Sequence, residues 1–165
     1  MSMKEVKSRK VEEEKPKPRI LLIDDDENIR RVLTEILQEK GYKVDPAETG
    51  ERAIELSNKR FYNIALIDIR LPDMSGVELL TRLKETKPKM RKVIITGYPT
   101  LENAIEALNR GAHAYIVKPL DISKALATIE QQLEKQREEE KMTEQQLVEY
   151  IETRVRQLEQ QEIRK

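Results

Sequence analysis

The chain has 165 residues, a length that accommodates one ordinary domain and appendages outside it. Hydrophobic and charged residues each make up 38%, and the mean hydropathy is −0.71, so we expect a packed core in only part of the chain. Basic and acidic residues both number 31, which argues against a nucleic-acid-binding protein, and the absence of cysteine excludes disulfides and thiolate metal sites.

The hydropathy pattern predicts a cytoplasmic protein with no membrane attachment. No apolar run approaches the roughly 20 residues that a membrane-spanning helix needs. Residues 1–18 are charged, end in Pro-Lys-Pro and lack the apolar stretch of a secretory signal. We expect these residues to form a flexible tail that precedes the folded part.

Five short apolar runs alternate with helical patterns over residues 19–134, the expected domain. The runs predicted to be strands are residues 19–24, 43–47, 64–69, 92–96 and 114–118. Amphipathic spacing predicts helices over residues 27–40, 50–58, 75–85 and 100–110. Continuous apolar strands alternating with helices are typical of an α/β domain whose parallel sheet is covered on both faces.

The C-terminal region is predicted to be helical throughout, because from Asp121 onward it contains neither Gly nor Pro. Leu126, Ile129 and Leu133 form an apolar stripe that can pack on the sheet. Residues 135–165 are expected to form a helical extension, and its first turns have no apolar face.

A second apolar stripe lies within this extension, formed by Leu147, Ile151, Val155 and Leu158. A solitary helix would expose the stripe to water, so we expect a partner helix to cover it in a coiled coil, unless it packs on its own domain. Thr143 and Gln146 match a capping box, so the region is either one long helix or two helices that break near Met142.

The polar residues at the strand ends predict a phosphoryl-transfer site. The side chains in question are Asp24, Asp25, Asp68, Thr96 and Lys118. Ligands of parallel α/β sheets bind beyond the carboxyl ends of the strands, so these groups should share one crevice. Clustered carboxylates suit Mg²⁺, the ammonium group can face phosphoryl oxygens, and an aspartate can accept a phosphoryl group.

Four sequence runs strongly resemble the receiver domain of two-component response regulators. They are LLIDDDENIR, LIDIRLPDMSG, VIITG and AYIVKP, in the family's order and spacing, and the resemblance extends from about Arg19 to Leu133. It implies a flavodoxin-like, doubly wound, five-stranded parallel sheet of strand order 2-1-3-4-5, similar to that of chemotaxis regulators. The sequence of residues 96–120 resembles that of receivers of enhancer-dependent transcription activators.

The resemblance also implies roles for individual residues. Asp68 matches the phosphoryl acceptor of the family. Asp24 and Asp25 match the carboxylates that bind Mg²⁺ together with Asp68, and Arg70 would add its backbone carbonyl. The family is not a class of enzymes acting on separate substrates, because its members are phosphorylated by a sensor histidine kinase and catalyse only that transfer and its reversal by hydrolysis.

Thr96 and Lys118 match the switch hydroxyl and the phosphate-binding lysine, and Tyr115 matches an aromatic residue whose rotamer follows phosphorylation. The Lys118–Pro119 bond is expected to be cis. The implied output surface is formed by the fourth helix, the fifth strand and the fifth helix. Homodimers would form through that surface or through the C-terminal helix, without nucleic acid or membrane.

Four other interpretations are compatible with parts of the pattern. The acidic triplet of residues 24–26 could simply cap the next helix. A phosphatase of the dehalogenase type also uses an aspartate on an α/β sheet, although Arg70 stands where that class carries a second aspartate. The chain could also be a pseudo-receiver that only binds partners, or a fragment of a larger regulator.

Overall fold

Five parallel strands and five helices make up the residues that the computed structural model describes, which are 16–164. The predicted flexible tail falls almost wholly on residues 1–15, outside the described residues. The elements are β1 (Arg19–Ile23), α2 (Glu27–Glu39), β2 (Lys43–Ala47), α3 (Gly50–Lys59), β3 (Ile64–Asp68), α4 (Gly76–Arg82), β4 (Arg91–Thr96), α5 (Leu101–Asn109), β5 (Ala114–Val117) and α6 (Ile122–Ile163).

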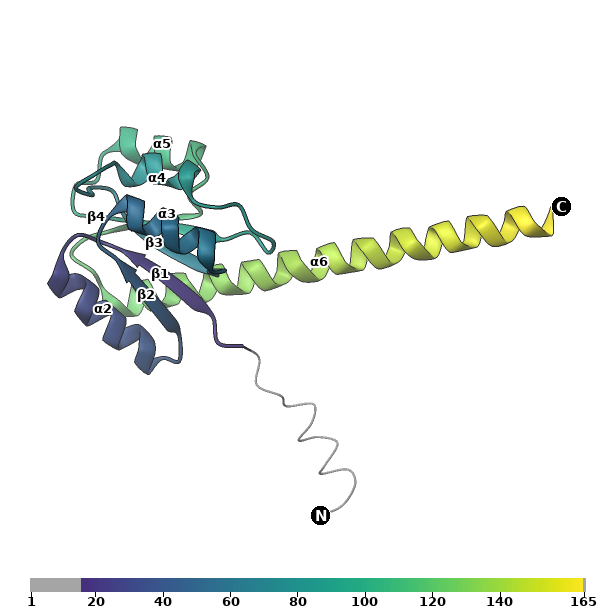
Figure 1. The fold of residues 1–165 in the computed structure, drawn as a ribbon, viewed down its shortest axis with the longest axis horizontal. Coiled ribbons are helices and arrows are strands. Elements are labelled where there is room, and N and C mark those ends of the chain that lie inside the picture. The colour runs from purple at the N-terminus through teal and green to yellow at the C-terminus, as the bar shows by residue number, and fades with distance from the viewer. Residues whose placement is uncertain (1–15, 165) are drawn as a thin grey trace, which may run out of the picture.

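The strands form one sheet in the order β2-β1-β3-β4-β5, as the resemblance implied. Helices α3, α4 and α5 cover one face, and α2 and the first part of α6 cover the other (Figure 1). Successive strand residues face opposite sides, so Leu21 and Ile67 belong to the core under α3–α5, while Leu22 and Leu66 belong to the core under α2 and α6. Burial on both faces explains why the strand sequences are continuously apolar.

The predicted elements all exist, and the largest difference in their bounds concerns the helix expected over residues 75–85. In the structure α4 ends at Arg82. The amide of Lys84 donates a hydrogen bond to the hydroxyl of Ser57, 3.3 Å away on α3, instead of continuing the helical ladder. Amphipathic spacing alone could not reveal this competing acceptor, which comes from another helix.

Helix α6 is a single continuous helix of 42 residues, and its second half projects away from the domain (Figure 1). The side chain of Asp121 caps its first turn by accepting from the amide of Lys124. The predicted capping box at Thr143 does not interrupt it, because the Thr143 hydroxyl donates to the carbonyl of Glu139 one turn earlier. Within residues 16–164, no helix has the length and apolar character needed to cross a membrane.

A buried polar network holds α6 where it leaves the sheet. The Arg91 guanidinium, at the start of β4, donates to Gln132 Oε1 at 2.9 Å and to Glu139 Oε1 at 3.0 Å. Gln136 donates to the carbonyl of Asn63 and accepts from the Asn63 amide group. The side chains of Gln132 and Gln136 are only 2% and 3% exposed. A substitution that removes a hydrogen-bonding partner of either glutamine would therefore leave a buried polar group unpaired.

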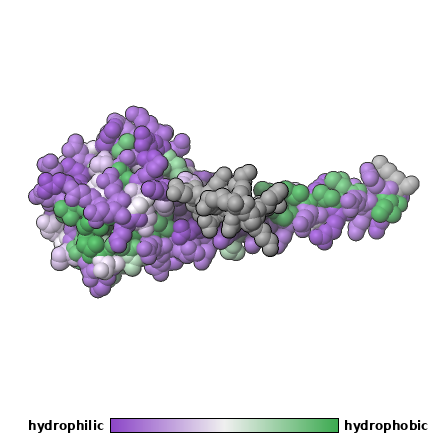
Figure 2. Space-filling view, turned by 90° about the horizontal axis from the view of Figure 1, so that it is seen from below, coloured by the Kyte–Doolittle hydropathy of each residue, from purple (hydrophilic) through white to green (hydrophobic). Residues whose placement is uncertain are grey.

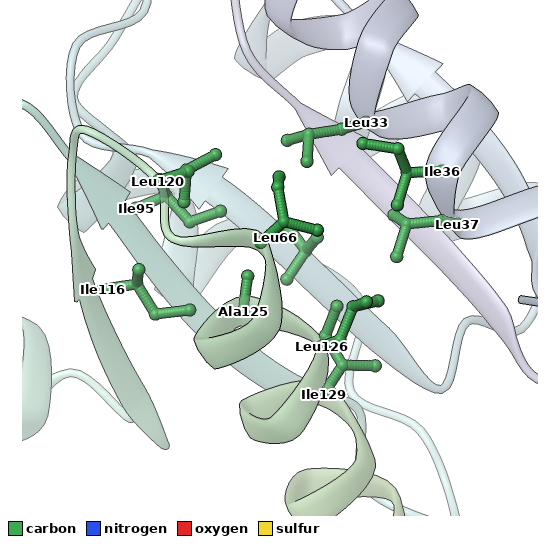
Figure 3. Close-up of a pocket in the computed structure, with 11 residues that line it drawn as sticks. Leu33, Ile36, Leu37, Leu66, Ile95, Ile116, Leu120, Ala125, Leu126 and Ile129 are labelled. Carbon is green, nitrogen blue, oxygen red and sulfur yellow. The ribbon is translucent and has the colours of Figure 1, made fainter.

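The apolar space between α2, α6 and the sheet is almost completely filled. Side chains of Leu33 and Leu37 from α2, Ile129 from α6, and Leu66 and Ile95 from the sheet converge there (Figure 3). The volume that the centre of a water molecule could occupy there is about 10 Å³, and the surrounding side chains are apolar. A space that small and apolar holds no ordered water, so this region is core and not a ligand site.

Candidate functional site

Two buried aspartates lie close together at the carboxyl-terminal edge of the sheet, because β1 and β3 are adjacent strands. Asp24 follows β1 and Asp68 ends β3, and the pairing of Ile23 with Ile67 aligns the two strand ends. Both aspartates are buried, whereas Asp25 is exposed. Carboxylate oxygens of all three lie within 4.8 Å of one another. This edge is also the point where strand order reverses, the position at which doubly wound sheets bind ligands.

Lys118 brings a positive charge to these carboxylates from beyond β5. Its Nζ lies 3.0 Å from Asp24 Oδ2 and 3.3 Å from Asp68 Oδ2. The amide of Lys118 donates to the carbonyl of Thr96, which fixes the backbone beside the end of β4, and the following bond to Pro119 is cis, as expected. The lysine therefore spans the end of β4 to reach β1 and β3.

The electrostatics of the site reflect a shortage of positive charge. Burial raises the pKa of Asp68, and the charge of Asp24 raises it further, although Lys118 and the amide of Arg70 act in the opposite direction. Burial by itself would lower the pKa of Lys118, but its hydrogen bond to Asp24 and the charges of Asp24 and Asp68 raise it overall. A further cation would stabilise the ionised form of Asp68.

The donor set fits Mg²⁺. Three carboxylates with oxygens this close repel one another unless a cation joins them, and Lys118 supplies only one positive charge. An open, all-oxygen site with few protein ligands is the kind that Mg²⁺ occupies in phosphoryl-transfer proteins, where it keeps several waters. Asp24, Asp25 and Asp68 are therefore candidate ligands, and Asp25 keeps one side of the site in contact with solvent.

Arg70 and Tyr98 form a pair beside the carboxylates. The amide of Arg70 donates to Asp68 Oδ1 at 3.3 Å, and its guanidinium lies 3.5 Å from the centroid of the Tyr98 ring. The contact joins the loop after β3 to the loop after β4 through a cation–π interaction. The sequence singled out Arg70 for its carbonyl and for its place two residues after Asp68, and a contribution of that carbonyl to metal binding stays a prediction.

Thr96 and Tyr115, the predicted switch residues, are both turned into the protein. Thr96 is fully buried, and its hydroxyl accepts from the amide of Tyr98 at 3.0 Å. The ring of Tyr115 packs against the core under α3–α5, and its hydroxyl is buried without a hydrogen-bond partner. A buried hydroxyl that lacks a partner is costly, so Tyr115 would gain from any movement that supplies one.

A family model described as the response regulator receiver domain matches residues 20–130 of this chain. The chain belongs to the response regulator receiver family. The interpretation of the site as that of a dehalogenase-type phosphatase is therefore set aside. The capping interpretation holds for Asp26 alone, whose carboxylate accepts from the amides of Asn28 and Ile29 at the start of α2.

Two similar proteins and one ligand-bound structure illustrate the relationship. The transcriptional regulatory protein ZraR of Escherichia coli O157:H7 is 37% identical over 114 residues, which are 69% of this chain and 26% of ZraR. A CheY-like receiver domain from Methanospirillum hungatei JF-1 is 41% identical with a TM-score of 0.72, covering 74% of this chain and 98% of that one. TrrA from Thermotoga maritima, solved with Mg²⁺ and BeF, is 31% identical with a TM-score of 0.63, covering 70% and 98%.

The receiver domain shared with ZraR is thus about a quarter of that longer regulator. The similarity to the Methanospirillum protein, in contrast, extends over nearly the whole of that chain. Receiver domains accept phosphoryl groups from histidine kinases and bind Mg²⁺ at an acidic pocket, which agrees with the donor set described above.

Three further residues support the receiver site, although the sequence alone assigned them no role. The Arg30 guanidinium donates to the carbonyl of Asp24 at 2.7 Å and so holds the backbone of the acidic loop. The carboxylate of Asp73 accepts from the amides of Gly50 and Glu51, which ties the loop after β3 to the start of α3. Gly76 packs against the main chain of Asp68.

Gly76→Ala should disturb the receiver site directly. An added Cβ would overlap the carbonyl oxygen of Asp68, a backbone atom that cannot move aside cheaply. We expect the free energy of unfolding, measured by urea denaturation, to fall by about 1–3 kcal/mol. The matched control is Gly97→Ala, where the nearest atoms are Lys118 Cβ and Cδ at 3.8 Å and the change should stay below about 1 kcal/mol. Equal effects of the two substitutions would contradict this account of Gly76.

His113, the only histidine of the chain, is held by the backbone of the neighbouring strand β4. It lies in the loop before β5 but is half-buried, and its Nδ1 accepts from the amide of Lys92 at 2.9 Å. Burial, followed by the positive charges of Arg91 and Lys89, lowers the pKa of His113 to about 4. Its place at the opposite end of the sheet from Asp68 assigns it a structural role.

Replacing His113 should flatten the pH dependence of stability on the acid side. Because the unfolded chain binds the proton near the usual value of 6.5 and the folded chain only near 4, stability falls as pH decreases through that window. We expect the wild-type chain to lose about 1–3 kcal/mol more than His113→Asn, which keeps an acceptor for Lys92, when urea denaturation at about pH 7 and about pH 4 is compared. Parallel pH profiles would rule out His113 as the cause.

Proposed function

We propose that the chain is a phosphoryl-accepting receiver domain in which Asp68 takes the phosphoryl group from the phosphohistidine of a sensor histidine kinase. The observation that carries the proposal is the convergence of Asp24, Asp25 and Lys118 on the carboxylate of Asp68. An oxygen of Asp68 attacks the phosphorus, a P–O bond forms, the P–N bond breaks, and its electron pair remains on the donor imidazole. Positioning and charge neutralisation are most of what such a transfer requires.

The residues proposed to hold Mg²⁺ are Asp24, Asp25 and Asp68, with the backbone carbonyl of Arg70. When bound, the ion neutralises charge on the phosphoryl oxygens. Lys118 already lies between Asp24 and Asp68, so its ammonium can follow the new negative charge with a small movement. Thr96 would exchange its hydrogen bond from the Tyr98 amide for one to a phosphoryl oxygen, with its hydroxyl as the donor.

We further propose that this exchange alters the surface formed by α5, β5 and α6. Thr96 and Tyr98 belong to one loop, so movement of the hydroxyl moves that loop and the contact of Tyr98 with Arg70. Tyr115 lies on the neighbouring strand with an unpaired buried hydroxyl that can respond. The output is a change in how two copies pair, through this surface or through the extension of α6. The protein acts on no separate substrate.

Incubation with Mg²⁺ and acetyl phosphate should add one phosphoryl group to the chain, read by intact mass. Asp68→Asn should abolish the gain, because it removes the attacking carboxylate, and chelation of Mg²⁺ should do the same. Asp73→Asn is a suitable control, since that carboxylate lies in the same loop but faces the amides of Gly50 and Glu51. A wild-type chain that stays unlabelled would identify a pseudo-receiver and sink the proposal.

Beryllofluoride, which imitates the phosphoryl group on aspartate, should change the pairing of copies. We expect small-angle scattering of the wild-type chain with Mg²⁺ and beryllofluoride to differ from that of the untreated chain in mass or shape. Asp68→Asn should show no difference under the same conditions. Identical scattering of treated and untreated wild-type chains, with labelling of Asp68 intact, would disprove the coupling but leave the phosphoryl acceptor in place.

A further inference from the structure

A hollow with a basic lining lies at the end of the sheet where β1, β2 and β3 begin, opposite the end that holds Asp68. Its lining includes four cationic side chains, those of Lys17, Arg19, Lys43 and Arg60, and within the described part of the chain it contains no carboxylate. The volume that the centres of water molecules could occupy there is about 450 Å³, which lies in the range of small-molecule sites. The hollow, called here the basic pocket, is therefore large enough for a ligand and attractive to an anion.

The positive charges of the basic pocket are only partly neutralised. Asp45 Oδ2 lies 3.4 Å from Arg19 Nη1 and 3.5 Å from Arg60 Nη1, so the two guanidinium groups share one carboxylate. Lys17 and Lys43 form no ion pair with another described residue. Four positive charges thus face one negative charge, and a ligand with several negative charges would correct the imbalance.

Backbone hydrogen bonds hold the basic pocket in a fixed shape. The amide of Lys43 donates to the carbonyl of Pro18 at 2.9 Å, which joins the starts of β1 and β2. The amide of Asn63 donates to the carbonyl of Arg19 at 2.9 Å, and the amide of Arg19 donates back to Asn63 Oδ1 at 3.0 Å, which joins β1 to the start of β3. A binding surface that is already ordered loses less conformational entropy when a ligand binds.

Phe61 adds an aromatic ring to the cations of the basic pocket. It is the only phenylalanine of the chain and is 40% exposed, whereas the next residue, Tyr62, is fully buried. On the face of the molecule shown in Figure 2, apolar groups gather in patches on the domain and along α6. The environment of Phe61 differs from such patches, because charged side chains line the same pocket. An aromatic face beside cations suits a ligand that joins a planar ring to an anion.

We propose that the basic pocket binds a free nucleoside di- or triphosphate. The polyphosphate lies among the side chains of Lys17, Lys43 and Arg60, and the base stacks on the ring of Phe61. A polyphosphate concentrates several negative charges on adjacent groups, which matches cations that surround a single hollow. A nucleic-acid strand instead spreads its charges along its length, one for each phosphate, so the free nucleotide is the favoured ligand. This site shares no residue with the one that contains Asp68.

The proposed nucleotide site adjoins the residues that anchor α6. Asn63 lines the basic pocket, and its side-chain amide donates to Gln136 Oε1 at 2.9 Å. The side-chain amide of Gln136 in turn donates to the carbonyls of Asn63 and Lys89, at 3.0 and 2.8 Å. Asn63 therefore belongs both to the pocket and to the contacts that hold the helix, so the amide group of Gln136 should respond to a bound nucleotide.

Isothermal titration calorimetry of the full chain with ATP tests the proposal. EDTA is present and Mg²⁺ is left out, so that the acidic pocket lacks the cation that would attract phosphate groups there. We expect a Kd below about 1 mM for ATP, and roughly tenfold weaker binding of methyl triphosphate, which has the polyphosphate but no base. A chain that does not bind ATP at about 1 mM, or that binds the two ligands equally, would overturn the proposal.

Variants of exposed residues separate the ring from the charges. Phe61→Leu should weaken ATP binding by roughly tenfold and leave methyl triphosphate unaffected. Lys17→Gln combined with Lys43→Gln should weaken both ligands by about tenfold or more. Lys124→Gln is the matched control and should change neither, because this exposed lysine lies at the start of α6, at the other end of the sheet. With the fold verified by circular dichroism, wild-type ATP affinity in the Phe61→Leu chain would refute the inference.

Amide chemical shifts, measured by nuclear magnetic resonance, locate the ligand. ATP should shift the backbone signals of Lys17, Lys43 and Asn63 and the side-chain amide of Gln136. Shifts centred on the acidic pocket instead would contradict the proposed site, and tighter binding of a single-stranded oligoadenylate than of ATP would identify nucleic acid as the ligand and overturn the proposal. A chain that is labelled on Asp68 yet binds no nucleotide would lose this inference alone.

Discussion

The contact of one ammonium group with two buried carboxylates holds the functional end of this domain together. Lys118 lies within 3.3 Å of both Asp24 and Asp68, which come from different strands. Without it, two negative charges would be buried side by side, an arrangement that proteins avoid by protonation or by binding a cation. The same contact leaves the site short of positive charge, so it is stable enough to fold yet attractive to a divalent ion and a phosphoryl group.

The sheet and the centre of the site were predictable because few folds are compatible with this sequence pattern. An apolar run such as residues 64–68 can be buried on both faces only inside a covered parallel sheet, and parallel strands bring their carboxyl ends to one edge. Asp24, Asp68 and Lys118 therefore had to approach one another once the strands were recognised. The family resemblance added the strand order, which periodicity cannot supply.

Features that depend on contacts between distant segments could not be predicted in this way. Asp73 looks like an ordinary turn residue, yet it caps α3, and Gln132 looks like a solvated helix residue, yet it is buried against Arg91. Each polar side chain has several plausible partners in the sequence, and only the packing selects one. The continuity of α6 through Thr143 could not be predicted for the same reason. The Thr143 hydroxyl can form a hydrogen bond equally well as a helix cap or within a helix.

The polar network around Gln136 makes α6 a stiff arm fixed at one end. From Gln136 to Ile163 the helix extends about 40 Å at 1.5 Å per residue. A tilt of about 5° at its base would displace the far end by roughly 3–4 Å, more than half of one helical turn. Rearrangements near β4 and β5 too small to reshape the domain itself would thus be magnified along the arm, and whatever joins its tip would receive a mechanical signal from an acidic pocket that it never touches.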